Sequence, residues 1–267
     1  KLRMTLGSWS ALQWLALVEH ELLLFAGVFF LIGSADELAV DATWAWLWLT
    51  GRARALEVRR ADYRSAALAG RAALFIPAWL EASVIGATIA HALAVWPQRE
   101  LRLYVGCYRN DLATAEAIVA AAGGDPRLRL VVHDRDGPTT KADCLNRLYA
   151  AMEADERRCG ERFRMVLLHD AEDMVDPAAL GLLDAALAHA DFVQLPVLPE
   201  PQSASRWIGS HYCEEFAESH GKAMVVRGRL GAGLPAAGVG CAFDRELLSA
   251  IAPDDRRSAP FSVDSLT

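Results

Sequence analysis

The sequence has little cysteine, and no two cysteines have the short spacing of a metal or redox site. Its 267 residues include five cysteines, none of them in a C-x-x-C motif. A disulfide framework and a zinc site of the usual spacing are therefore not indicated, and we expect reduced thiols that face the cytosol. The five are Cys107, Cys144, Cys159, Cys213 and Cys241.

The chain also lacks the positive charge of a nucleic-acid-binding protein. Lysine and arginine number 27 against 34 aspartates and glutamates, which gives a formal net charge of −7. A nucleic-acid surface needs clustered positive charge, so we expect no nucleic acid among the partners. Internal repeats and low-complexity tracts are missing too, and the length suits one sizeable domain plus an appendage.

Polar residues are scarce near the N-terminus, where residues 9–32 are apolar at all but five positions, which are Ser10 and four larger polar residues. Twenty-four residues exceed the ~20 that a helix needs to cross a bilayer, so we expect a transmembrane helix. A buried core helix or an interfacial helix are the alternatives, because polar groups inside a membrane are costly. The features of a cleaved signal peptide are missing. The four larger polar residues are Gln13, Glu19, His20 and Glu21.

Tryptophans and arginines follow this stretch in the order that is typical of a membrane interface. Trp44, Trp46 and Trp48 precede a basic cluster that begins at Arg52, and such clusters face the cytoplasm. We expect the segment 38–49 to lie at the interface, with a hairpin that returns through the membrane as the alternative. Residues 1–69 are then the transmembrane helix and juxtamembrane segment, and residues 70–267 a cytoplasmic domain.

From Arg71 onward, short apolar runs alternate with segments of helical pattern. This alternation is typical of the α/β class, with a mostly parallel sheet flanked by helices. Ligands bind such sheets beyond the carboxyl ends of the strands, so polar residues that follow the strands should share one edge. We expect strands at 72–77, 101–106, 128–132, 165–169 and 192–195, and helices at 81–94, 113–122, 141–154 and 178–188.

One predicted strand ends abruptly in carboxylates. Asp170 and Glu172 stand two residues apart, so they point the same way if the strand geometry persists. Two hard oxygen donors at a strand end suit a divalent cation and, through it, a phosphate. Helix capping explains Asp176, which precedes Pro177 at a helix start, and it also suits Asp173.

Five short motifs follow one another along the chain. They are Ile76–Glu81, Gly137–Asn146, His169–Asp173, Glu215–Lys222 and Ala237–Gly240. The first resembles the Pro-Ala-x-x-Glu signature of family 2 glycosyltransferases, the second contains their Lys-Ala-x-x-Leu-Asn helix start, and the third looks like their Asp-x-Asp metal motif. The last four together resemble the phage-adsorption protein B type of bacterial inner-membrane glycosyltransferase. The resemblance covers about residues 30–267.

The resemblance implies a GT-A fold and a nucleotide-sugar donor, usually a UDP-sugar, used to make envelope or extracellular polysaccharide. It places Mg²⁺ or Mn²⁺ on Asp170 and Glu172, where the metal would neutralise the charge that builds on the diphosphate leaving group. Lys141 would add a second positive charge. An ordinary solvated lysine in the first turn of a helix fits the same position.

The resemblance assigns further donor contacts to Pro77, Glu81 and Asp111, alongside Lys141 and Asp170. The family often carries two adjacent acids near Asp111, which this chain lacks. Loop capping by Asp111 is therefore an open alternative, as is a helix-start role for Glu81.

The acceptor side and the general base fall near the end of the chain. Gly238 and Gly240 permit close backbone approach, and the resemblance places them beside a saccharide or lipid-linked acceptor. In the family the base is the aspartate of Thr-Glu-Asp, which would follow Thr267, while Asp264 stands too early. A base must reach the proton that it removes, so no catalytic base is expected in this chain and we expect the chain alone to be inactive.

The function that we expect is the N-terminal part of a metal-dependent inverting glycosyltransferase in the bacterial inner membrane. The missing base leaves a second interpretation, a non-catalytic membrane-anchored docking or scaffold module of the envelope with an outer-envelope partner protein. A nucleotidyltransferase is a weaker third interpretation, because no glycine-rich phosphate loop follows the first strand.

Overall fold

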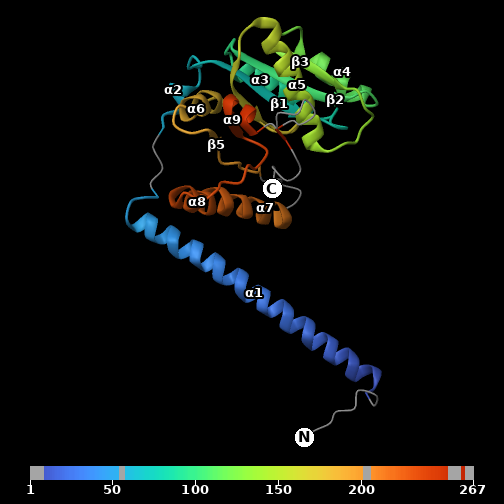
Figure 1. Ribbon diagram of the computed structural model, residues 1–267, viewed down its shortest axis with the longest axis vertical. Helices are drawn as coiled ribbons and strands as arrows, with labels where there is room; N and C mark the ends of the chain where they lie inside the picture. The colour runs from blue at the N-terminus through green and yellow to red at the C-terminus, as the bar shows by residue number, and fades with distance from the viewer. Residues whose placement is uncertain (1–8, 54–57, 201–205, 252–259, 262–267) are drawn as a thin grey trace. The chain divides into compact units, whose positions relative to one another are not determined.

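The computed structural model describes residues 9–53, 58–200, 206–251 and 260–261. The chain divides into two compact units (Figure 1). The first comprises Lys1–Ala55 and Pro199–Gly233, and the second comprises Leu56–Leu198 and Leu234–Thr267. The predicted domain boundary after residue 69 therefore stays a prediction, and the compact units divide the chain at other positions.

The first unit is built around one long helix, α1, from Ala11 to Leu49. Ser10 and Gln13 form a capping box at its start, which satisfies backbone N–H groups that would otherwise lack a partner. At 1.5 Å per residue its 39 residues extend about 58 Å, more than a bilayer core requires. The alternative of a hairpin at 38–49 was wrong, because these residues continue the same helix. Their expected position at the membrane interface stays a prediction.

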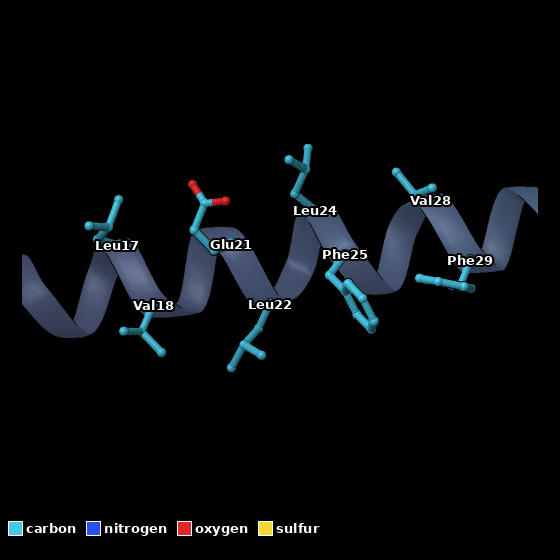
Figure 2. A pocket seen from close by; sticks show the side chains of 8 residues that line it. All are labelled: Leu17, Val18, Glu21, Leu22, Leu24, Phe25, Val28 and Phe29. Atoms are coloured by element: carbon cyan, nitrogen blue, oxygen red, sulfur yellow. The ribbon is translucent and has the colours of Figure 1, made fainter.

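The apolar part of α1 is open to its surroundings. It is the one helix of the described chain that is long and apolar enough to cross a membrane, and none of its most apolar window is buried. Figure 2 shows a shallow depression along it, where apolar side chains and the carboxylate of Glu21 project from a single helix. The depression is lined by Leu17, Val18, Glu21, Leu22, Leu24, Phe25, Val28 and Phe29.

The rest of the first unit is a helical rod made of three successive elements. They are α7 (Arg206–Glu218), the π-helical segment η2 (Ser219–Ala223) and α8 (Met224–Leu230). The Lys222 ammonium group pairs with Asp41 of α1 and with Glu218 of α7. Lys222 thus links the helical rod to the C-terminal half of α1 through its ion pair with Asp41.

The second unit contains a six-stranded sheet in the order β3-β2-β1-β4-β6-β5. The first four strands of this order pair in parallel, and β6 pairs antiparallel with both β4 and β5. This confirms the predicted α/β sheet, and all five predicted strands are present. The bounds are β1 Arg71–Pro77, β2 Leu101–Tyr108, β3 Leu128–His133, β4 Phe163–Leu168, β5 Phe192–Gln194 and β6 Cys241–Asp244.

Strand β6 was not predicted. Its four residues are too few to show the alternation that marks a strand, and the preceding segment reads as a glycine loop. The strand forms because it pairs with two neighbours: Cys241 is opposite Leu168 of β4 on one side and Gln194 of β5 on the other. Long-range pairing of this kind leaves no local signal in the sequence.

Helices cover both faces of the sheet. The alternation of β1 divides the core, because Leu74 and Ile76 pack with α3, α4 and α6 whereas Ala73 and Phe75 pack with α5 and α9. All four side chains are fully buried. The bounds are α2 Arg60–Tyr63, α3 Ile85–Val95, α4 Leu112–Ala122, α5 Lys141–Cys159, α6 Ala179–Ala186 and α9 Arg245–Ile251.

Helix α3 begins four residues later than predicted. The expected start at Glu81 lies in a loop, where Leu80 adopts a left-handed backbone conformation with φ of 58°. Side chains of the next βα connection hold this loop, since the backbone N–H of Leu80 donates to Asp111 and that of Glu81 donates to Thr114. The loop conformation is thus fixed from outside its own sequence.

Candidate functional site

The predicted site residues gather at one edge of the sheet. Pro77 ends β1, Asp111 follows β2, and Asp170 follows β4. Because β6 runs antiparallel to β4, its amino end, with Gly240 just before it, lies at the same edge. The backbone N–H of Gly240 donates to the carbonyl oxygen of Leu168 at 2.9 Å.

The carboxylates after β4 do not continue the strand. β4 ends at Leu168, and the chain turns at Ala171 and Glu172, so the conditional expectation that Asp170 and Glu172 share a strand face was wrong. The turn is held by Asp173, whose carboxylate accepts from the backbone N–H of Asp170 at 2.7 Å and lies 3.2 Å from Nδ1 of His169. Asp173 is therefore occupied locally, which leaves Asp170 and Glu172 for a ligand.

Asp176 caps the turn that leads into α6. Its carboxylate accepts from the backbone N–H of Ala178 at 2.8 Å. The predicted N-cap role of Asp176 was wrong, because Ala178 occupies the N-cap position. The helix itself begins at Ala179. The carboxylate also lies 3.3 Å from Arg60, so Asp176 is a structural residue.

The centre of the site is an ion pair between two predicted donor-binding residues. Nζ of Lys141 lies 2.5 Å from Oδ1 of Asp170, and the same ammonium group is 3.4 Å from the carbonyl oxygen of Gly238. Both charged side chains are about a third exposed, at 38% and 34%. The structure thus brings residues 141, 170 and 238 together although 97 residues separate the first from the last.

Glu172 lies in a field of negative charge. The pKa of its carboxyl is raised, first by desolvation and then by repulsion from Asp170, Glu81 and Asp173. A cation placed among these acids would relieve the repulsion.

The carboxylates fit a metal that shares its coordination with a substrate. Among the described residues, no group of three or more His, Cys, Asp or Glu side chains could hold a metal ion by itself. Mg²⁺ sites commonly use one or two carboxylates and complete their coordination with phosphate oxygens and water. Asp170 and Glu172 are hard oxygen donors in this sense and match that mode of binding.

Asp111 performs the capping role that the sequence left open. It is buried, and its carboxylate accepts from the backbone N–H of Leu80 at 2.7 Å and from that of Thr114 at 3.2 Å. Burial alone would raise the pKa of this carboxyl, but hydrogen bonds from Thr114 and Leu80 outweigh it and hold the pKa below its usual value. Asp111 thereby fixes the loop that carries Glu81.

An aromatic group beside this loop was not foreseen. Trp79 packs edge-on against Tyr108, with ring centroids 5.1 Å apart, and Tyr108 stacks on His133 at the same separation. A side chain at Gly137 would meet the Trp79 ring at 2.4 Å, so glycine is required there. Trp79 and Tyr108 stand in predicted motifs or loops, but nothing in their spacing indicates that the rings meet.

Gln194 holds the loop that contains Gly238 and Gly240, a role that no pattern in the sequence indicates. Its amide nitrogen donates to the carbonyl oxygens of Leu195 and Val239, each at 2.9 Å, and its amide oxygen accepts from the backbone N–H of Ala237 at 3.0 Å. Both glycines have positive φ, 75° and 64°, which favours glycine. A single side chain thus sets the conformation of the predicted acceptor loop.

Asn146, the last residue of the second motif, anchors the chain near its C-terminal end. Its amide nitrogen donates to the carbonyl oxygen of Phe261 at 2.7 Å, and its amide oxygen accepts from the Phe261 backbone N–H at 3.0 Å. The position expected to precede the general base, Thr267, and the residue Asp264 lie outside the described residues.

Comparisons with known proteins agree with this architecture. The family model of "Glycosyltransferase like family 2" matches residues 69–264. Bacteriophage adsorption protein B of Escherichia coli K12 is 36% identical over 195 residues, which cover 73% of this chain and 26% of that protein. Bacteriophage N4 adsorption protein B of Escherichia coli O157:H7 gives the same values. The chain therefore spans about a quarter of the length of these two relatives.

A solved structure shares the fold. Mannosyltransferase PcManGT from Pyrobaculum calidifontis, in complex with GDP-Man and Mn²⁺, superposes with a TM-score of 0.53 at 18% identity. The match covers 85% of this chain and 61% of that one, and it confirms the expected GT-A-like fold. Since the family match extends from just before β1 to residue 264, the chain belongs to glycosyltransferase-like family 2.

Proposed function

We propose that this chain carries the donor-binding site of a membrane-anchored, metal-dependent glycosyltransferase that uses a nucleotide-sugar, with a UDP-sugar as the first candidate. The observation that carries the proposal is the Lys141–Asp170 pair at the sheet edge, next to the crowded carboxylate of Glu172. The similar mannosyltransferase binds GDP-Man and Mn²⁺, which supports a donor and metal of these classes.

The diphosphate of the donor would lie between Lys141 and the two carboxylates. Mg²⁺ or Mn²⁺ held by Asp170 and Glu172 would act as a Lewis acid that stabilises charge on the leaving group. Lys141 would hold the diphosphate by charge from the opposite side, at the amino end of α5, where the helix dipole also favours an anion.

The nucleoside would lie against the loop after β1. Pro77 ends that strand, and Asp111 shapes the loop by its hydrogen bonds to backbone N–H groups. In this arrangement Asp111 acts by positioning the loop, and Glu81 is the carboxylate left for the nucleotide. The acceptor, a saccharide or a lipid-linked sugar, would approach the loop of Gly238 and Gly240.

The membrane assignment rests on α1 and the residues that follow it. The exposed apolar helix would cross the bacterial inner membrane, and Arg52, which stacks over Trp46 at 5.1 Å, would mark the cytoplasmic interface. The strand-and-helix unit would then lie in the cytoplasm and serve the synthesis of envelope polysaccharide.

Binding of nucleotide-sugars tests the proposal and requires no general base. UDP-, GDP- and dTDP-sugars are screened by thermal shift and calorimetry with and without Mn²⁺, on the chain in detergent. We expect one of them to bind only with metal, and the double variant D170N/E172Q to abolish that binding. The control D62N/E116Q, which removes two exposed acids elsewhere, should bind as the unmodified protein does. Metal-independent binding that D170N/E172Q leaves unchanged would contradict the proposal.

A further inference from the structure

The ammonium group of Lys141 rests on the carboxylate that is proposed to bind the metal. At 2.5 Å from Oδ1 of Asp170, it occupies that oxygen as a charge-assisted hydrogen-bond donor. The pair is partly exposed and not enclosed by packing, so the lysine can leave. Asp170 thus already pairs with a cation that the chain itself supplies.

Because Lys141 stands at the start of a helix, its pairing with Asp170 is favoured only while no stronger anion lies there. Lys141 is the first residue of α5, a helix of 19 residues, and the positive end of a helix dipole disfavours a cation. Asp170 supplies the compensating negative charge in the structure. A diphosphate at the amino end of α5 would supply more charge and would also accept from backbone N–H groups.

Asp170 cannot serve the ammonium group and a divalent metal equally well. Two cations on one carboxylate repel each other, and the repulsion is strong at separations of a few ångströms outside bulk water. The lysine side chain is a compact charge on a flexible stem, so it can swing to a nearby anion. Its second acceptor, the carbonyl oxygen of Gly238, belongs to the loop that Gln194 holds, which fixes the resting position.

We propose that Lys141 is a placeholder cation, which occupies Asp170 until the donor diphosphate draws it away and leaves that carboxylate to the metal. Metal and nucleotide then bind cooperatively, and part of this cooperativity depends on Lys141. The inference rests on the proposed function, since it takes the metal and the diphosphate to meet at Asp170.

Binding of Mn²⁺ alone tests the placeholder directly. The affinity is measured by electron paramagnetic resonance of free Mn²⁺ in the absence of nucleotide. We expect Lys141→Met to bind Mn²⁺ about tenfold more tightly than the unmodified protein, within the range of typical coupling factors. Lys141→Arg, which keeps the cation, should stay near the unmodified value. The control Arg162→Met, which breaks an exposed ion pair with Glu246, should leave the affinity unchanged.

The linkage measurement then separates this inference from the proposed function. In the unmodified protein, UDP, or GDP where the screen selects it, should raise Mn²⁺ affinity, and Mn²⁺ should raise nucleotide affinity by the same factor. Lys141→Met should lower both factors by the same amount, while the coupling that comes from the phosphate oxygens shared with the metal remains. Unchanged or weaker Mn²⁺ binding by Lys141→Met would overturn the placeholder role even where the nucleotide binds with metal. Nucleotide binding without metal would overturn the proposed function, while the Mn²⁺ comparison still decides the role of Lys141.

Discussion

Replacement of Arg245 by methionine should strongly destabilise the strand-and-helix unit. The guanidinium group is 3% exposed and forms a two-pronged contact with Glu156, from Nε to Oε1 at 3.1 Å and from Nη2 to Oε2 at 2.9 Å. It also donates to the hydroxyl of Tyr149 at 2.6 Å. Without the arginine, the buried Glu156 carboxylate keeps one neutral donor, the backbone N–H of Phe163 at 2.9 Å.

The expected loss of folding stability follows from the Glu156 carboxylate that is left buried and unpaired. Removal of one partner of a buried ion pair costs about 3–5 kcal/mol, because the other charge stays desolvated and unpaired. For a unit of this size the loss corresponds to a drop of roughly 6–20 °C in the melting temperature. The double variant R245M/E156Q should recover part of the loss, because a neutral amide costs less to bury than a carboxylate.

Thiol labelling reports the unfolding of this unit separately from α1. Burial raises the pKa of Cys107 to about 11 and the pKa values of Cys144 and Cys241 to about 12, so these thiols should not react at neutral pH in the folded protein. Maleimide labelling against urea concentration, with the exposed Cys159 as the always-labelled reference, therefore measures the free energy of unfolding.

The matched control is Arg162→Met. Its partner Glu246 lies 2.6 Å away, but both side chains are more than half exposed, so its loss should cost less than about 1 kcal/mol. If R245M costs no more than this control, or if R245M/E156Q is as unstable as R245M, the argument from a desolvated carboxylate fails.

Three other perturbations give distinct results. The pKa of Asp111 is lowered in the folded protein, so the stability that this carboxylate contributes is fully present above its unfolded-state pKa. That contribution is lost as pH falls through the folded-state pKa. The urea concentration at the unfolding midpoint should therefore decrease once the pH is below about 4. Asp111→Ala should cost about 1–2 kcal/mol at pH 7 and flatten that acid limb, and an unchanged limb would contradict the assignment. Gly181→Ala would put Cβ 2.4 Å from a backbone oxygen of α2 and should cost about 1–3 kcal/mol in urea denaturation, whereas Gly228→Ala, with open space around it, should be neutral or stabilising. Asn146→Leu removes both hydrogen bonds to Phe261 and should cost about 1–3 kcal/mol, with faster hydrogen exchange at residue 261; unchanged exchange would count against the anchor.

Local patterns predicted the parallel part of the fold well. Apolar runs located β1 to β5, and Thr140 caps α5 at the predicted start, Lys141. The rule that ligands bind beyond the carboxyl ends of parallel strands predicted that polar residues after the strands share one edge, and Asp111 and Asp170 lie there. The position of Lys141 in the site was expected from the family resemblance. The metal-binding and donor-binding roles of these residues remain predictions.

The parts that could not be predicted depend on contacts between distant segments. Helix α3 begins late because Asp111 and Thr114 hold the loop before it, which no pattern in residues 77–85 reveals. The turn at Asp170 follows from one hydrogen bond of Asp173, where strand geometry was an equally good local expectation. Gln194 is a single polar residue at the end of β5. It can hold the loop of Gly238 and Gly240 only because β6 pairs beside β5 and brings that loop next to it.

The pairing of β5 with β6 makes the chain between them a self-contained insertion. Residue 194 and residue 241 are register partners, so the polypeptide leaves the sheet and returns to it at adjacent points. The length and content of the excursion can therefore change without a change in strand register, as in a domain insertion at a hairpin. Part of this excursion, Pro199–Gly233, is the segment that groups with α1. Exchange of that segment between relatives is thus a route to alter the unit that contains α1 while the sheet edge stays intact.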